Sequence, residues 1–107
     1  MKAAARFRGM ALTVYALELC FYGERGDYEV FPDRELGLDL VPLGKGFADR
    51  GWAVDESGPE VIMFQDPEGT EYTLYPDGRL IIEGLKPGSP AQAWTQAQGI
   101  LGFEVVA

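Results

Sequence analysis

The residues that could bind a metal ion are carboxylates gathered around one short turn. Asp66, Glu68 and Glu71 lie in and just after the segment Asp66-Pro67-Glu68-Gly69. Carboxylate oxygens are the ligands that calcium and magnesium prefer, but this spacing lacks the regular alternation of a calcium-binding loop. Turn formation alone explains Asp66 and Gly69, because Asp and Gly are preferred in tight turns. We therefore predict no metal site and no cofactor.

The single cysteine, Cys20, is the side chain with the strongest potential as a nucleophile. The chain contains no histidine, which is the commonest general base for activating a thiol. Glu18 lies two residues earlier in an extended segment, where its negative charge disfavours a neighbouring thiolate. The segment Gly44-Lys45-Gly46 is only a fragment of a phosphate-binding loop, since no Ser or Thr follows the lysine. We predict that the protein has no catalytic residue and is not an enzyme.

The charge of the chain argues against nucleic acid as a partner. Its 107 residues include 17 acidic and 9 basic side chains, for a net charge of −8. Three of the bases, Lys2, Arg6 and Arg8, lie within the first eight residues, so the rest of the chain is still more acidic. Binding to phosphates requires a basic surface. We predict no nucleic-acid binding, and we expect residues 1–9 to form a flexible basic arm.

The composition also suggests where the protein works. One cysteine cannot form an intrachain disulfide, which favours a reducing, cytoplasmic setting. The apolar run Met10–Leu17 after the basic arm resembles a secretory signal, but Glu18 interrupts it and Leu19 replaces the small residue that precedes a cleavage site. No apolar run approaches the roughly 20 residues of a membrane span. The absence of asparagine is typical of a thermophilic bacterial protein.

Alternation of side chains predicts a long strand over residues 12–22, followed by a turn and a second strand over 28–31. One face of the first strand carries Tyr15, Leu17, Leu19 and Phe21, and we expect this face to be buried. The other carries Val14, Ala16, Glu18, Cys20 and Tyr22. The two strands form a predicted hairpin.

Further along the chain, the pattern predicts two helices, a short strand and a three-stranded meander. Residues 39–52 form the weaker helix, because Gly44 and Gly46 disfavour a helix interior. A short strand follows at 52–54, and strands at 60–65, 70–75 and 79–83 are joined by two Pro- and Gly-containing turns. Ser89 begins the second helix as its N-cap, and Gly102 ends it.

This order of elements resembles one half of the saddle-shaped TATA-box-binding protein, in which each repeat runs strand, helix, four strands, helix. The resemblance covers about the second half of the chain, in the segment VIMFQDPEGTEYTLYPDGRLIIEGLK and in Ala93 and Ile100. It implies a half-saddle fold. It does not imply DNA binding, because the positions of two arginines of that family hold Phe64 and Asp66, a strand threonine becomes Glu83 and one wedge phenylalanine becomes Gly58.

Together these patterns predict a single α+β domain over residues 1–107, with a curved antiparallel sheet of about five to six strands and two helices on one face. Our leading hypothesis is a non-enzymatic protein–protein interaction module that acts as a homodimer. The candidate interaction face comprises Val14, Ala16, Cys20, Tyr22, Phe64, Tyr75 and Ile81. One alternative is a small-molecule-binding domain with a pocket between the sheet and the helices. A second alternative, an acidic mimic of nucleic acid, follows only from the charge.

Overall fold

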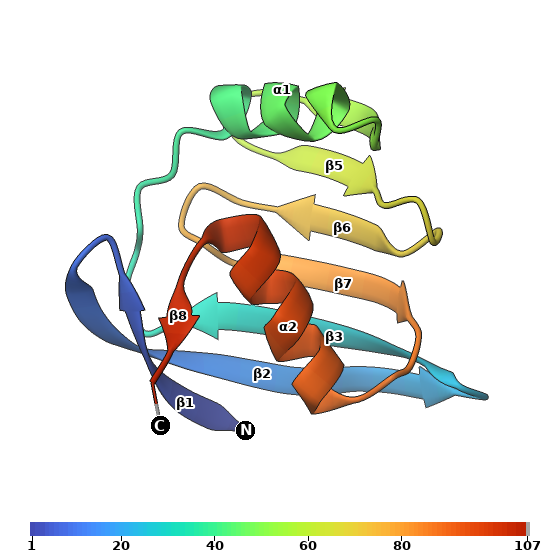
Figure 1. Cartoon of the computed structure of the whole chain (residues 1–107), viewed down its shortest axis with the longest axis horizontal. Coiled ribbons are helices and arrows are strands. Elements are labelled where there is room, and N and C mark those ends of the chain that lie inside the picture. Colours follow the sequence, from blue (N-terminus) through green and yellow to red (C-terminus); the bar gives the residue numbers. More distant parts are fainter. Residues whose placement is uncertain (107) are drawn as a thin grey trace.

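The chain forms one antiparallel sheet with two helices packed against the same face (Figure 1). The computed structural model describes residues 1–106. The elements are β1 (Lys2–Phe7), β2 (Met10–Tyr22), β3 (Arg25–Pro32), α1 (Leu40–Asp49), β4 (Ala53–Ser57), β5 (Ile62–Gln65), β6 (Glu71–Leu74), β7 (Leu80–Leu85), α2 (Pro90–Leu101) and β8 (Glu104–Val105). The strand order is β4-β5-β6-β7-β3-β2-β1-β8. The predicted α+β class and antiparallel sheet are confirmed, but the sheet has eight strands rather than five to six.

The two strands missed by the sequence analysis lie at one side of the sheet, where β1 pairs with β2 and β8 pairs with β1. The expectation of a flexible basic arm was wrong for residues 2–7, which form β1. Ala5 and Phe7 are buried beneath the helices, while Lys2 and Arg6 alternate with them on the opposite side. The cations therefore mask an alternating strand pattern. A turn at Arg8-Gly9, with positive φ angles at both residues, leads into β2.

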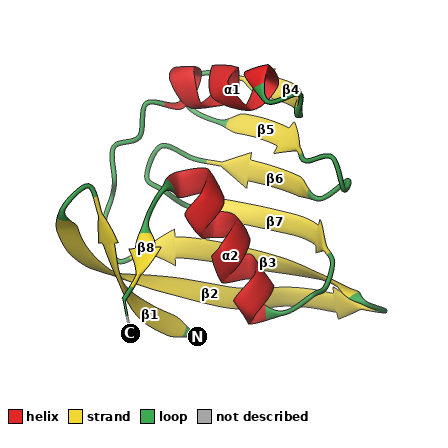
Figure 2. Ribbon diagram, in the orientation of Figure 1, coloured by secondary structure: helices red, strands yellow, loops and turns green. Residues whose placement is uncertain are grey.

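Both predicted helices are present. Asp39 is the residue before α1. The side of α1 that faces the sheet buries Leu40, Gly44 and Phe47. The second helix begins as expected, because the Ser89 hydroxyl accepts a hydrogen bond from the Gln92 N–H at 3.2 Å. It ends at Gly102 with φ 81°, the left-handed conformation that favours glycine. Figure 2 shows the two helices lying over the sheet, α1 over β4 and β5 and α2 across β7, β3 and β2.

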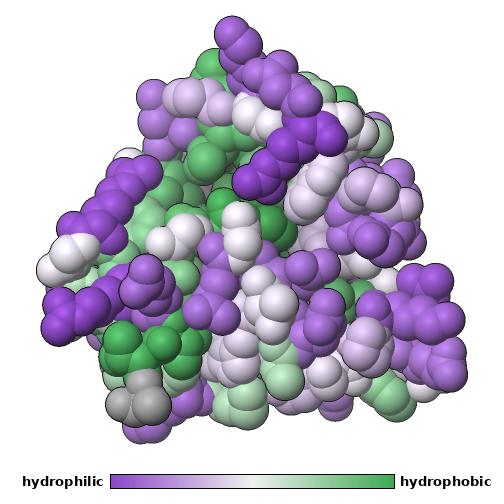
Figure 3. Space-filling view, viewed as in Figure 1, coloured by the Kyte–Doolittle hydropathy of each residue, from purple (hydrophilic) through white to green (hydrophobic). Residues whose placement is uncertain are grey.

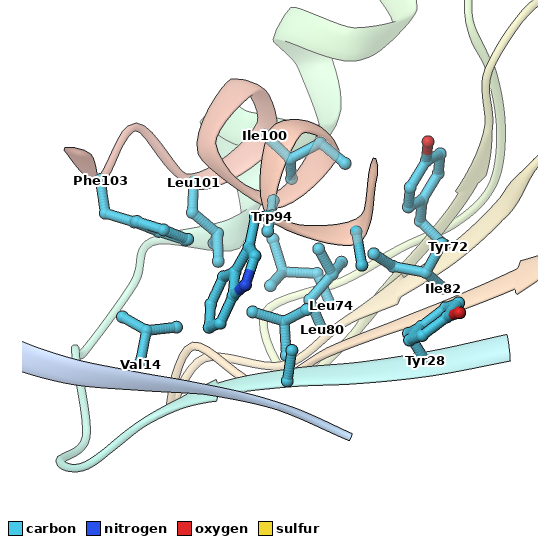
Figure 4. Packing of buried hydrophobic residues seen from close by; sticks show 14 of the residues in the cluster. Val14, Tyr28, Tyr72, Leu74, Leu80, Ile82, Trp94, Ile100, Leu101 and Phe103 are labelled. Atoms are coloured by element: carbon cyan, nitrogen blue, oxygen red, sulfur yellow. The ribbon is translucent and has the colours of Figure 1, made fainter. Parts of the chain in front are cut away.

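The core lies between the helices and the face of the sheet that they cover. Trp94 from α2 points down toward Val14 on β2, and Leu74 and Leu80 lie beside it, whereas Ile82 lies closer to Tyr28 and Tyr72 (Figure 4). Under α1, the rings of Phe47 and Phe64 stack 4.3 Å apart. Apolar burial of this extent is the main stabilising term of a domain of this size. The predicted meander is confirmed as β5, β6 and β7.

Strand β3, helix α1, strands β4–β7 and helix α2 follow one another as strand, helix, four strands, helix. This is the order that the TATA-box-binding-protein resemblance implies, and the relationship itself stays a prediction. Across residues 1–106, neither helix has the length and apolar character needed to cross a membrane.

Candidate interaction face

The second face of the sheet, which we call the open face, is not covered by either helix of the described residues 1–106. Both helices pack on the first face: Phe47 of α1 stacks on Phe64, and Gln96 of α2 donates a hydrogen bond to the Tyr72 hydroxyl at 3.1 Å. Phe64 and Tyr72 are directly paired on β5 and β6, so their side chains lie on the same side of the sheet. Side chains that alternate with them point to the open face.

Pairing places one row of side chains directly across the open face. The pairs run from β2 to β4 in the order Leu17, Glu29, Ile81, Thr73, Met63 and Glu56. Leu17 is 45 % exposed and Met63 is 44 % exposed. A neighbouring row adds Tyr15 and Phe31, whose rings stack 5.3 Å apart. Apolar side chains from four strands therefore lie along the middle of this face, with Glu29 and Thr73 between them. We call Tyr15, Leu17, Phe31, Ile81 and Met63 the apolar band, a grouping typical of an interaction surface.

Three members of the predicted interaction face lie in the core instead. Val14, Ala16 and Phe64 are no more than 4 % exposed and lie beneath the helices. The expected assignment of the two faces of β2 was therefore wrong. Val14 and Ala16 are on the helix side, whereas Leu17, Leu19 and Phe21 are exposed. Both faces of this strand are apolar, so alternation alone could not show which face the helices would cover.

The other four predicted residues are accessible but are not all together. Ile81 and Tyr75 lie on the open face and are half-buried. Cys20 and Tyr22 lie at the far end of β2, beyond a β-bulge at Leu19. The Tyr22 hydroxyl donates a hydrogen bond to Asp27 at 2.9 Å, and this bond raises the pKa of the tyrosine.

The bulge at Leu19 also changes the environment that was expected for Cys20. Pairing shifts from Glu18↔Tyr28 to Cys20↔Asp27, so that Glu18 and Cys20 come to lie on opposite sides of the sheet. The Tyr28 hydroxyl donates a hydrogen bond to Glu18 at 3.2 Å. Burial and this hydrogen bond raise the pKa of Tyr28. Glu18 is therefore a partner of Tyr28 rather than a neighbour of the thiol.

Charged side chains of both signs lie on the open face. Arg79 lies beside Tyr75 at the turn between β6 and β7, where its guanidinium stacks 4.3 Å from the Tyr75 ring centroid and its Nε is 3.8 Å from Glu29. A shallow groove of about 290 Å³ runs beside these residues toward Asp33. Lys2 and Arg6 lie at the β1 corner. Acidic side chains lie on β7, β6 and β4, namely Glu83, Glu71 and Glu56, and Glu104 of β8 lies directly opposite Arg6.

The space between α1 and the sheet is largely filled by aromatic rings. Phe47, Phe64, Tyr72 and Trp52 form a continuous stack with centroid distances from 4.3 to 6.0 Å. What remains is a cleft of about 130 Å³ between α1 and α2. Figure 3 shows hydrophobic side chains in the hollow between the helices, surrounded by a hydrophilic surface.

Asp66 has a structural role that turn formation only partly predicted. Its carboxylate accepts hydrogen bonds from the Glu68 and Thr70 N–H groups, each at 3.0 Å, and from the Tyr72 hydroxyl at 2.8 Å. Burial and the bond to Asp66 raise the pKa of Tyr72 strongly. Within residues 1–106, no three carboxylate or thiol side chains converge as they would around a metal ion.

No protein-family model, curated protein or solved structure matches this chain. Its functional site must therefore be inferred from its own geometry.

Proposed function

We propose that the protein is a non-enzymatic interaction module that forms a homodimer through the open face of its sheet. The observation that carries this proposal is the apolar band formed by Tyr15, Leu17, Phe31, Ile81 and Met63, opposite the face covered by the helices. Packing two such faces together removes this band from water, which favours association by about 25 cal/mol for each Å² of apolar surface buried.

The dimensions of the molecule agree with such an interface. Its principal extents are 35 × 32 × 20 Å, and the sheet lies in the two longer dimensions (Figure 1). A stable interface buries roughly 800 Å² on each partner. A face of this size can supply that area, whereas a contact through one strand edge cannot.

The two end strands of the sheet, β4 and β8, are poorly suited to pairing with another chain. Edge strand β4 contains a bulge between Val54 and Glu56 and carries the exposed acids Asp55 and Glu56. The other edge strand, β8, pairs through only two residues. Bulges, charges and short length are devices that prevent edge-to-edge association. Neither end strand therefore favours edge-to-edge pairing, which leaves the apolar band as the surface that we propose for self-association.

A charge introduced into the apolar band tests this proposal. In Leu17→Lys the new ammonium lies directly opposite Glu29 on β3, so the monomer gains an opposite-charge pair. In a dimer this pair would be removed from water, where the cost of desolvating both charges exceeds their attraction, and the apolar contact of Leu17 would be lost. Sedimentation velocity should therefore show a dimer for the wild type and a monomer for the variant.

Val41→Lys is the matched control. Val41 is 51 % exposed on helix α1, so its substitution makes the same change in charge on the helix side of the molecule. This variant should remain dimeric. A wild-type chain that sediments as a monomer at about 1 mM, a concentration at which even a weak specific interface is occupied, would contradict the proposal.

A second candidate function is the binding of a small anionic ligand in the cleft between the helices. The cleft is lined by Pro42, Leu43, Gly46, Phe47, Arg50 and Ile100. Arg50 lies over the Phe47 and Trp52 rings at 5.6 and 5.7 Å, and none of the described carboxylates forms an ion pair with it. A short-chain carboxylate fits this combination of an apolar cleft and a cation. Stabilisation by butyrate or hexanoate that is lost in Arg50→Gln would support this function, and no thermal shift would contradict it.

A further inference from the structure

The charges on the open face are arranged so that one copy complements another, and the following inference rests on the proposed homodimer. Lys2 pairs directly with Tyr15, and Arg6 with Ala11, so both cations lie on the open face at its β1 side. Both residues are exposed. Glu104 of β8 lies directly opposite Arg6, whereas Lys2 has no directly paired carboxylate among the described residues. Neither cation forms an ion pair with a described residue of its own chain.

A pair of like charges lies on the other side of the same face. Glu71 on β6 and Glu83 on β7 are directly opposite each other, and both are exposed. Like charges at directly paired positions destabilise a sheet. No ion pair within the described chain offsets this repulsion. A cation supplied from outside the chain would relieve it.

The order of the strands places the two charged regions symmetrically. From β1 the strands run β2, β3, β7 and β6, so β3 lies midway between the cations and the glutamate pair. In an interface with two-fold symmetry, if residue i contacts residue j, then j of the first copy also contacts i of the second. We propose that the two-fold axis of the dimer crosses β3, so that Lys2 of each copy contacts the Glu71–Glu83 pair of the other.

The register also determines how the two sheets cross. Leu17 and Thr73 lie in the same row across the sheet. Lys2 lies beside Tyr15, on one side of this row, and Glu71 lies on the other side because β2 and β6 run in opposite directions. A two-fold axis that brings Lys2 over Glu71 must therefore be oblique to the strands. The strands of the two copies then cross at a large angle, as in orthogonal sheet packing.

Charge reversal tests this arrangement. Lys2→Glu should weaken the dimer about tenfold, because it removes two symmetry-related ion pairs and adds two repulsions. Glu71→Lys should weaken it by a similar factor, although the same substitution relieves the repulsion from Glu83 within the monomer. The double variant should return to within about threefold of the wild-type dissociation constant, since it restores opposite charges across the interface.

Lys45→Glu is the control, because Lys45 is exposed on α1 and its reversal changes the net charge by the same amount as Lys2→Glu. It should change the dissociation constant less than threefold. A carbodiimide, which joins amines to carboxylates in direct contact, should also link Lys2 to Glu71 or Glu83 between copies. Copies labelled with ¹⁴N and ¹⁵N distinguish this link from one within a chain by mass spectrometry.

The outcomes separate this inference from the proposed function. Recovery in the double variant together with the intermolecular cross-link supports the arrangement. A dimer that Leu17→Lys disrupts, but in which the reversals at Lys2 and Glu71 act no more strongly than Lys45→Glu, would overturn the arrangement and leave the homodimer standing. A wild-type chain that is monomeric at about 1 mM would overturn both.

Discussion

Replacing Asp66 with alanine should destabilise the protein far more than the same change at Asp77 in the next turn. Asp66 is 6 % exposed and accepts three hydrogen bonds, from the Glu68 N–H, the Thr70 N–H and the Tyr72 hydroxyl. Asp77 is exposed and its carboxylate accepts one hydrogen bond, from the Arg79 N–H at 3.0 Å. The two substitutions remove the same atoms from two similar hairpin turns.

The loss of stability in Asp66→Ala can be calculated from the hydrogen-bond donors that lose their acceptor. Thr70 and Tyr72 are buried, and each unsatisfied buried donor costs about 1–3 kcal/mol. Glu68 is exposed, so its N–H can bind water at little cost. We therefore expect Asp66→Ala to lower the free energy of unfolding by about 3 kcal/mol, with about 2 kcal/mol as the lower limit. Asp77→Ala should cost about 1 kcal/mol or less, because water replaces the lost acceptor at an exposed site.

Urea denaturation followed by tryptophan fluorescence measures this difference. All variants should be compared at one protein concentration, since the unfolding midpoint of a dimer depends on it. For a chain of this length, 3 kcal/mol corresponds to a fall in melting temperature of roughly 12–24 °C. Equal losses of stability at the two positions would refute the reasoning that the buried carboxylate holds the β5–β6 hairpin together.

Three further predictions concern the core and the glycines. Burial and the hydrogen bond to Asp66 raise the pKa of Tyr72, so folding favours the protonated hydroxyl. This stabilisation is complete below the unfolded pKa of about 10 and is lost as the pH rises above it. Tyr72→Phe should therefore make the free energy of unfolding fall less steeply above pH 10 in urea titrations at a series of pH values. Gly88→Ala should destabilise the fold by about 2 kcal/mol or more in the same assay, because its Cβ would lie 2.6 Å from backbone atoms of Arg25 and Gly26. Gly99→Ala should stabilise α2 by up to about 1 kcal/mol, since its Cβ would meet nothing within 4 Å, and a loss of stability there would contradict the reasoning.

The hairpin, the meander and the second helix could be predicted because local signals and tertiary packing agree there. The Ser89 cap and the Gly102 end of α2 are examples, since both depend on residues next to them in sequence. The strand at residues 2–7 was missed because Lys2, Arg6 and Arg8 look like a solvated arm when they are counted as charges. The strand partners of Lys2 and Arg6, which are Tyr15 and Ala11, come next to them only when the chain folds back on itself.

The open face was harder to predict than the fold. Every strand presents two faces, and on β2 both are apolar, so that Val14 was assigned to the surface and Leu17 to the core. The location of α2 decides this choice, and α2 lies more than 60 residues further along the chain. The bulge at Leu19, which moves Cys20 to the other side from Glu18, has no local sequence signal that we identified.

The most direct test of the central claim is sedimentation velocity of the wild-type chain and Leu17→Lys over a range of concentrations up to about 1 mM, where weak specific association is still detected. Our account predicts a concentration-dependent dimer for the wild type and a folded monomer for Leu17→Lys, with Val41→Lys behaving like the wild type. A monomeric wild type, or a dimer that Leu17→Lys leaves intact, would contradict it.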